Sequence, residues 1–211
     1  MLAGAGLLAT FGAAGTVRWA TGWTFVAVLA VGLAVHGAYV QARNPGLLRT
    51  REHVGAGTAR WDLAWVAVFW PLVGAGPVLA GIETVRLGRS ALAPGWAAAG
   101  GAVLGAGLAL SARAMAVNPH FEGTARLQPG QRVVDGGPYR RIRHPGYAGL
   151  ALMVLGGSAL LRSRWALAAG ASGAAWIAVR TALEDRMLRA GLPGYEDYAR
   201  RVRRRLVPCL W

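Results

Sequence analysis

The 211-residue chain contains no lysine, a single cysteine and only nine acidic residues. One cysteine, Cys209, cannot form an internal disulfide or supply a thiolate metal cluster, and we expect no metal site. The acids are outnumbered by 23 basic residues, all arginine, which gives a formal net charge of +14. No stretch of the chain is polar enough for a separate soluble domain. We therefore assign this charge to contacts with anionic lipid headgroups and expect no nucleic-acid partner.

Long apolar runs make up most of the chain. Hydrophobic residues account for 55% of it, with a mean hydropathy of +0.37, which is too apolar for a soluble domain of this size. The N-terminal run lacks the basic region and the cleavage site of a signal peptide, so we interpret it as a first span. Six segments are long or apolar enough to be candidate membrane helices, some of them short: 2–16, 20–41, 62–81, 95–117, 146–161 and 165–183. The sequence thus predicts an all-α, polytopic transmembrane bundle of about six spans, or five if the first is peripheral.

The arginines are distributed unevenly among the predicted loops. Sixteen of the 23 fall in the 41–60 loop, the 118–145 loop and the tail from Glu184, whereas five lie in the loops of the other side. The positive-inside rule then places both termini in the cytoplasm. We expect an integral membrane protein, of the bacterial inner membrane, with its polar segments on the cytoplasmic side.

Two of these cytoplasmic segments contain sequence motifs that a merely solvent-exposed loop would not need. Residues 136–149 read GGPYRRIRHPGYAG and lead directly into an apolar run, and residues 180–208 begin with RTALEDRML. Arg180 and Glu184 are four residues apart, so a helix would place them on one face. Arg180 follows an apolar run, at a depth where a charge is costly and commonly marks a polar cavity or a ligand. The alternative is an arginine that reaches the headgroups and pairs with Glu184.

The order of these motifs, GPYRRIRHPGYAG, then RTALEDRML, then GYEDYARRVRRRLVP, resembles the isoprenylcysteine carboxyl methyltransferase family and its bacterial relatives, which grade into the phospholipid N-methyltransferases. The resemblance covers about residues 115–208. It implies N-terminal transmembrane helices over 1–117 and a catalytic region over 118–211, with a helical hairpin at 146–183 and a cytosolic tail. It further implies an S-adenosylmethionine-dependent methyltransferase.

The resemblance also implies the residues of a cofactor pocket on the cytoplasmic side. Arg180 would point at the methyl acceptor as the catalytic residue, and Glu184 would hold the polar end of S-adenosylmethionine. The residues implied to bind the cofactor are Gln128, Gln131, Arg132, Val133, Val134, Tyr139, His144, Pro145, Gly146, Tyr147 and Glu184. Two positions depart from the family pattern, since relatives often have histidine at Gln131 and a second glutamate at Asp185.

The chemistry of the pocket agrees with this implied assignment. S-adenosylmethionine needs an acid for its ammonium, donors for its carboxylate and aromatic faces near its sulfonium. A carboxylate acceptor needs no general base, and an arginine could hold it bidentately. We therefore predict O-methylation of a lipophilic carboxylate, on an isoprenoid, prenylated or lipid-like substrate that enters from the membrane lipids.

Other interpretations stay open from the sequence alone. Phospholipid N-methylation belongs to the same family, and a membrane NADPH-dependent sterol-type reductase shares the RHPxYxG box. A non-catalytic scaffold or transporter is a third class, although no inverted repeat supports it. Individual residues have structural alternatives too: His144 could cap its loop, Tyr147 could belong to the interfacial belt, and His36 is best explained by packing. We interpret Glu83, Glu122 and the tryptophan pairs Trp19/Trp23 and Trp61/Trp65 as headgroup or belt residues. The oligomeric state is not predicted.

Overall fold

A computed structural model of the chain describes residues 2–47, 57–89 and 91–207; Cys209, Arg49 and Arg51 lie outside them. Helices account for most of the described residues, and these residues form no strand. The main helices are α1 (Leu2–Ala14), α2 (Ala20–Arg43), α4 (Arg60–Gly81), α5 (Gly95–Val117), α6 (Pro145–Leu160), α7 (Arg164–Gly191) and α8 (Tyr195–Arg201). Two single turns, η1 (Ile82–Arg86) and η2 (Gly137–Arg140), complete the order. The predicted all-α class is confirmed.

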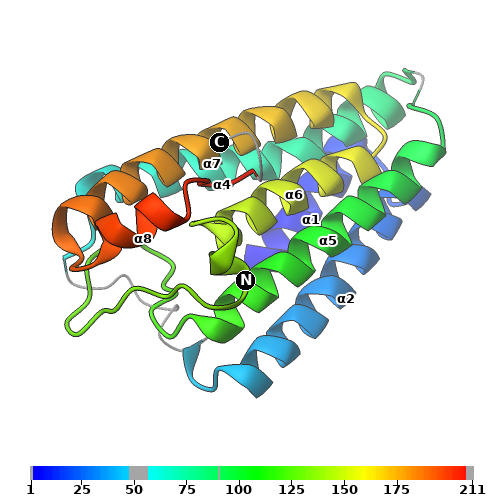
Figure 1. The fold of residues 1–211 in the computed structure, drawn as a ribbon. Coiled ribbons are helices and arrows are strands. Elements are labelled where there is room, and N and C mark those ends of the chain that lie inside the picture. Colours follow the sequence, from blue (N-terminus) through cyan, green and yellow to red (C-terminus); the bar gives the residue numbers. More distant parts are fainter. Residues whose placement is uncertain (1, 48–56, 90, 208–211) are drawn as a thin grey trace.

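Each of the six predicted apolar segments forms a helix, and the helices lie alongside one another in a bundle (Figure 1). Among the described residues, four stretches are long and apolar enough to cross a membrane: α2, α4 together with η1, α5 and α7. The 16-residue α6 is apolar but shorter, and α1 has 13 residues. The six predicted segments are therefore confirmed as helices. How many of them cross the membrane stays a prediction.

Helices α5 and α6 pack backbone against backbone. A Cβ atom added at Gly107 would lie 2.6 Å from the carbonyl oxygen of Gly149, and one at Gly156 would lie 2.4 Å from the backbone nitrogen of Leu104. Small residues at a helix interface allow this close approach, which is the usual way to pack helices in lipid. The backbones of α5 and α6 therefore lie in direct contact along these glycines.

The predicted hairpin between α6 and α7 turns at Leu161–Ser163. Arg162 has a positive φ of 56° and donates from Nε to the carbonyl of Leu92 at 2.7 Å. Ser163 caps α7 by accepting from the backbone N–H of Ala166, and its hydroxyl donates to Glu83 at 2.5 Å. Glu83 is only 2% exposed, so its interpretation as a headgroup residue is wrong: η1 folds it inward onto the hairpin turn.

Helix α7 continues to Gly191, eight residues beyond its predicted end at residue 183. The extension carries Glu184, Asp185 and Leu188 out of the apolar bundle toward the long segment 118–144 and α8, which gather at one end of the molecule (Figure 1). Leu188 packs there against Tyr195 and Tyr198 of α8. The chain thus places its polar motifs together at that end.

Candidate active site

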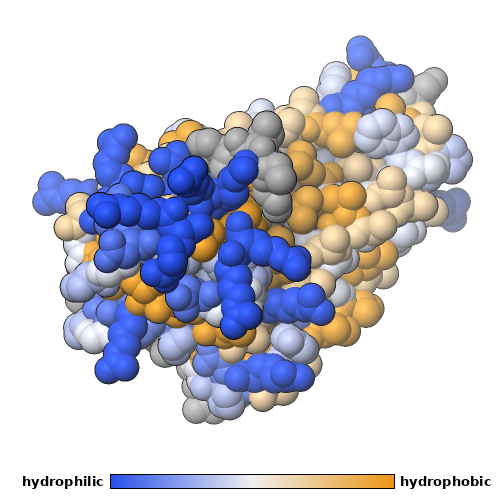
Figure 2. Space-filling view, in the orientation of Figure 1, coloured by the Kyte–Doolittle hydropathy of each residue, from blue (hydrophilic) through white to orange (hydrophobic). Residues whose placement is uncertain are grey.

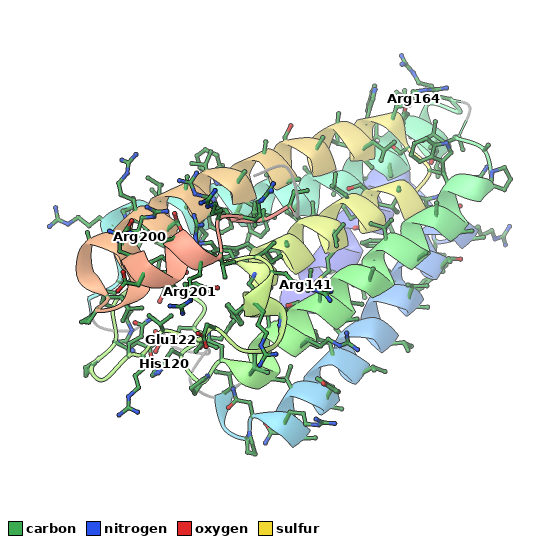
Figure 3. The ribbon with its side chains drawn as sticks, in the orientation of Figure 1. His120, Glu122, Arg141, Arg164, Arg200 and Arg201 are labelled. Carbon is green, nitrogen blue, oxygen red and sulfur yellow. The ribbon has the colours of Figure 1, made fainter. Side chains whose placement is uncertain are left out.

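A cavity lies at this end of the bundle, between segment 118–134, the turn that precedes α6, the end of α7 and α8. Its empty volume, including the open mouth, is about 790 Å³. His120 and Glu122, which line it, lie below α8 with Arg200 and Arg201 nearby, and Arg164 marks the opposite end of the molecule (Figure 3).

Ten of the eleven residues predicted to bind the cofactor line this cavity. They are Gln128, Gln131, Arg132, Val133, Val134, Tyr139, His144, Gly146, Tyr147 and Glu184. Pro145 is not among the lining residues; it is fully buried at the first position of α6, where its fixed φ starts the helix. The structure thus brings together predicted residues as far apart in the sequence as Gln128 and Glu184.

Segment 118–134 is held in place by its own polar side chains. Gln128 donates from Nε2 to the carbonyl of His120 at 2.8 Å, and the side chain of Gln131 accepts from the backbone N–H of Gln128 at 2.9 Å. His120 Nδ1 lies 3.4 Å from Gln128 Oε1. Glu122 forms an ion pair with Arg126 at 2.6 Å and is half-buried at the cavity, and its interpretation as a headgroup residue stays a prediction.

The turn before α6 brings Tyr139 into the cavity wall. Gly137, the first residue of η2, has a φ of +55°, a conformation that suits glycine. The Tyr139 hydroxyl accepts from Asn118 at 3.0 Å, and its carbonyl accepts from the hydroxyl of Tyr198 at 2.8 Å. Burial raises the pKa values of Tyr139 and Tyr198 well above the usual range, so both phenols stay neutral donors or acceptors.

Asp185 is the hub of the polar network behind this wall. Its carboxylate is 1% exposed and accepts from Arg143 at 2.7 and 3.0 Å and from the hydroxyl of Tyr195 at 3.0 Å. Its Oδ1 atom also lies 3.2 Å from His144 Nε2. Burial alone would lower the pKa of Arg143, but the bonds and the charge of Asp185 raise it above its usual value. A single buried carboxylate therefore fixes the arginine and the histidine of the RHP motif.

The same network anchors the C-terminal segment. Arg205 donates from Nε to Asp185 at 3.1 Å, and Arg143 donates from Nη1 to the carbonyl of Val202 at 2.7 Å. The backbone N–H groups of Arg143 and His144 donate to the carbonyls of Arg204 and Arg205, each at 2.9 Å. The tail is thus hydrogen-bonded along the turn that starts α6. His144 stands at the N-cap position of α6 without a side-chain cap bond, so its loop-capping alternative is not what the structure shows.

Glu184 faces the cavity one position before Asp185 in α7. It accepts a short hydrogen bond from the hydroxyl of Tyr147, which lies on the first turn of α6. The ring of Tyr147 lies 5.9 Å from that of His144, with the two planes near parallel. Tyr147 therefore connects the RHP motif to the acidic end of α7 and does not serve as a belt residue.

One interpretation of the sequence paired Arg180 with Glu184, but the structure does not show this pair. The partner of Arg180 is Asp62 in the first turn of α4: Arg180 Nε lies 2.8 Å from Asp62 Oδ1, and Nη2 donates to Oδ2 at 3.0 Å. The first contact is an ion pair without hydrogen-bond alignment. Asp62 is 0% and Arg180 6% exposed, and Nη2 also donates to the carbonyl of Gly123 at 2.9 Å.

Aromatic rings enclose this ion pair. The guanidinium of Arg180 lies 4.5 Å from the ring centre of Trp65 and 5.2 Å from that of Tyr147. Trp65 is 3% exposed and donates to the carbonyl of Trp176, so its interpretation as a belt residue is wrong. Asp62 also accepts from the backbone N–H of Ala125 at 2.7 Å, which ties segment 118–134 to α4. Arg180 does not itself line the cavity and is separated from it by Tyr147.

Three buried charged side chains at this site were not among the predicted site residues: Asp62, Arg143 and Asp185. Arg143 and Asp185 lie next to the predicted residues His144 and Glu184. The sequence motifs were therefore recognised, but the buried ion pair between their neighbouring residues was not. Asp62 lies in the first turn of an apolar helix, and its place among only nine acids is the one signal that the sequence offers. Conversely, His36 behaves as expected: its Nε2 lies 3.4 Å from the hydroxyl of Ser111 between α2 and α5.

The described residues thus form an all-helical bundle with four apolar helices of membrane-spanning length and a polar cavity at one end. Residues 96–192 match the family model of the phospholipid methyltransferases. The match runs from the start of α5 to the end of α7, and over this region the chain is similar to that family of membrane methyltransferases. No curated protein matches the chain. The predicted resemblance is thereby confirmed, and the predicted division at residue 118 stays a prediction.

Proposed function

We propose that the protein transfers a methyl group from S-adenosylmethionine to a lipophilic acceptor at the membrane surface. The observation that carries this proposal is the cavity at the end of α7, where Glu184 and Tyr147 meet within the region matched by the methyltransferase family. The family match also favours methyl transfer over the sterol-type reductase that shares the RHPxYxG box.

The residues of the cavity fit the groups of this cofactor. Glu184 offers a carboxylate to an ammonium, and Arg132 and the backbone of segment 118–134 offer donors to a carboxylate. The rings of Phe121, Tyr139 and Tyr147 supply aromatic faces, which attract a sulfonium as they attract other cations. Arg143 is already satisfied by Asp185, so its charge is structural and does not repel a cationic ligand.

S-adenosylmethionine, when bound, would supply a methyl group activated by its sulfonium. The protein's own contribution is position and exclusion of water, which are sufficient for a displacement in which donor and acceptor are held in line. Tyr147 orients the carboxylate of Glu184 through its hydroxyl, and Asp185 holds His144 against the wall. Tyr195 and Tyr198 line the cavity on the α8 side, and the C-terminal segment that follows α8 is hydrogen-bonded to Arg143 and His144.

The acceptor would have to reach Arg180, which does not line the cofactor cavity, past the ring of Tyr147, which contacts both. A lipophilic carboxylate would have to displace Asp62 from Arg180, or bind through the part of the guanidinium that Asp62 leaves exposed. The Asp62–Arg180 pair is neutral overall, and Glu184 adds a negative charge nearby. This arrangement favours a second candidate, the amine of a phospholipid headgroup, which needs no displacement of Asp62.

A methyl-transfer assay separates the two acceptors. The purified protein is supplied with S-adenosylmethionine labelled on the methyl group, and with phosphatidylethanolamine or a farnesylated cysteine derivative that has a free carboxylate. Label in base-stable lipid products indicates N-methylation, and label released by base as methanol indicates a methyl ester. The Glu184→Gln variant is the control for the cofactor site. Absence of transfer to any lipophilic acceptor, with the cofactor bound, would refute the proposed acceptor class.

A further inference from the structure

A second cavity runs along the face of α6 that lies between α5 and α7. Its wall is apolar and comes from all three helices, with Leu110 on α5, Ala151, Leu152 and Leu155 on α6, and Ala174 and Ala178 on α7. Its empty volume, open side included, is about 2,350 Å³. None of its lining residues also lines the candidate active site. We call it the α6 groove.

Four arginines line the same groove: Arg43, Arg113, Arg140 and Arg141. All four are exposed, and no acidic residue is part of the lining. Within the described ranges, no carboxylate lies within 4 Å of any of these four guanidinium groups. Figure 2 shows hydrophilic side chains gathered at this end of the molecule, with hydrophobic surface beyond them. The groove therefore has uncompensated positive charge next to a continuous apolar wall.

The arginines lie at one end of the groove, and its apolar wall extends from them along α6. Arg140 and Arg141 belong to the turn just before α6, where Figure 3 shows Arg141, and Arg113 lies in the last turns of α5. From there the wall extends along α6 from Ala148 to Leu155, a rise of about 10 Å into the apolar bundle. Cations at the membrane surface above an apolar groove match the layout of a phospholipid.

We propose that the α6 groove binds an anionic phospholipid, with the phosphate group at Arg113, Arg140 and Arg141 and the acyl chains along Ala151, Leu155 and Ala174. Arginine forks bind phosphate oxygens bidentately, and each basic residue near an anionic surface adds attraction. This site goes beyond the proposed methyl transfer, because its occupant lies beside the cofactor cavity and not within it.

The turn η2 is the partition between the two cavities. Pro138, Arg140 and Arg141 line the groove, whereas Tyr139 and Arg143 line the active-site cavity. A phosphate held at Arg140 would therefore hold the turn that carries Tyr139. We expect the bound lipid to stabilise this wall of the cofactor cavity.

The test measures the binding of defined lipids to the full chain in detergent. The probes are dioleoylphosphatidylglycerol and, as the neutral counterpart, dioleoylphosphatidylcholine, each titrated at constant ionic strength. A groove variant and a control variant each lose three positive charges at the same end of the molecule. The groove variant is Arg113→Gln/Arg140→Gln/Arg141→Gln, and the control is Arg60→Gln/Arg186→Gln/Arg203→Gln.

We expect the wild-type and control proteins to prefer the anionic lipid, and the groove variant to bind it roughly 10–100-fold more weakly. A third variant, Ala174→Trp, keeps every arginine but fills the groove, and it should weaken binding as well. Equal losses in the groove and control variants would overturn the proposal, since diffuse surface charge would then explain the binding. So would unchanged binding in Ala174→Trp, because the acyl chains would then lie elsewhere. Circular dichroism of each variant verifies that the bundle is folded.

Discussion

The ion pair between Asp62 and Arg180 should be strongly coupled in a double-mutant cycle. Asp62→Asn keeps an acceptor for the backbone N–H of Ala125 but removes the charge, and Arg180→Met keeps most of the apolar stem. Each single variant leaves one charge buried without its partner, because Asp62 is 0% and Arg180 6% exposed. The double variant leaves neither.

The structure sets the size of the effect. At 2.8 Å, two unit charges attract by about 6 kcal/mol for an effective dielectric constant of 20, and desolvation offsets part of this. Breaking a buried pair by removing one partner typically costs about 3–5 kcal/mol. We expect each single variant to lose about this much, or about 6–20 °C in Tm, and the double variant to lose much less than the sum.

Thermal unfolding in detergent, followed by tryptophan fluorescence, measures the four proteins of the cycle. The exposed pair Arg201–Asp135, with an N–O distance of 3.0 Å, supplies a matched cycle in which coupling should be close to zero. Additive losses at Asp62 and Arg180 would refute the reasoning, because they would mean that the two side chains do not share a buried pair.

Three further predictions concern the tail, the helix packing and the alkaline limit. Asp185→Asn should release the C-terminal segment. Limited trypsin digestion would detect this as faster cleavage at the arginines after residue 199. Unchanged cleavage would contradict the role of Asp185 as the anchor of this segment. Gly156→Ala should lower the Tm because its Cβ would overlap the backbone of α5, at a cost of about 1–3 kcal/mol, while Gly105→Ala, with open space around it, should not; equal Tm values would contradict the close packing. Burial, followed by the charge of Asp185, raises the pKa of Tyr195 well above its ordinary value of 10.0. The unfolded chain then loses that proton first, so stability should fall as the pH rises above about 10, and less so in Tyr195→Phe; identical pH profiles would show that Tyr195 is not responsible.

The helices were predictable because their apolar runs are long and turn signals separate them. The end of α7 was not, because hydropathy falls after Val179 while the helix continues. Its last turns are amphipathic: Leu188 packs on Tyr195 and Tyr198, whereas Arg186 and Arg189 remain exposed. Hydropathy predicts only the part of a helix that lies in lipid. The helix itself continues for as long as its side chains pack against the rest of the protein.

The partners of buried charges were the least predictable part of the site. Arg180 and Glu184 are four residues apart, and local spacing suggested a pair, yet Arg180 binds Asp62, 118 positions away in the chain. Glu83 likewise binds Ser163, 80 positions away. Such contacts depend on which helices become neighbours, and no local pattern records that. The cavity residues could be named in advance because the motifs that carry them resemble those of the family.

The central claim is that the cavity at Glu184 binds S-adenosylmethionine. The most direct test is calorimetric titration of the purified protein with S-adenosylhomocysteine, with NADPH in parallel and Glu184→Gln as the variant. We predict saturable binding of S-adenosylhomocysteine to the wild-type protein, weaker by roughly 10–100-fold in the variant because a charge-assisted bond is lost, and no binding of NADPH. Binding of NADPH alone, or S-adenosylhomocysteine affinity that is the same in both proteins, would contradict the account.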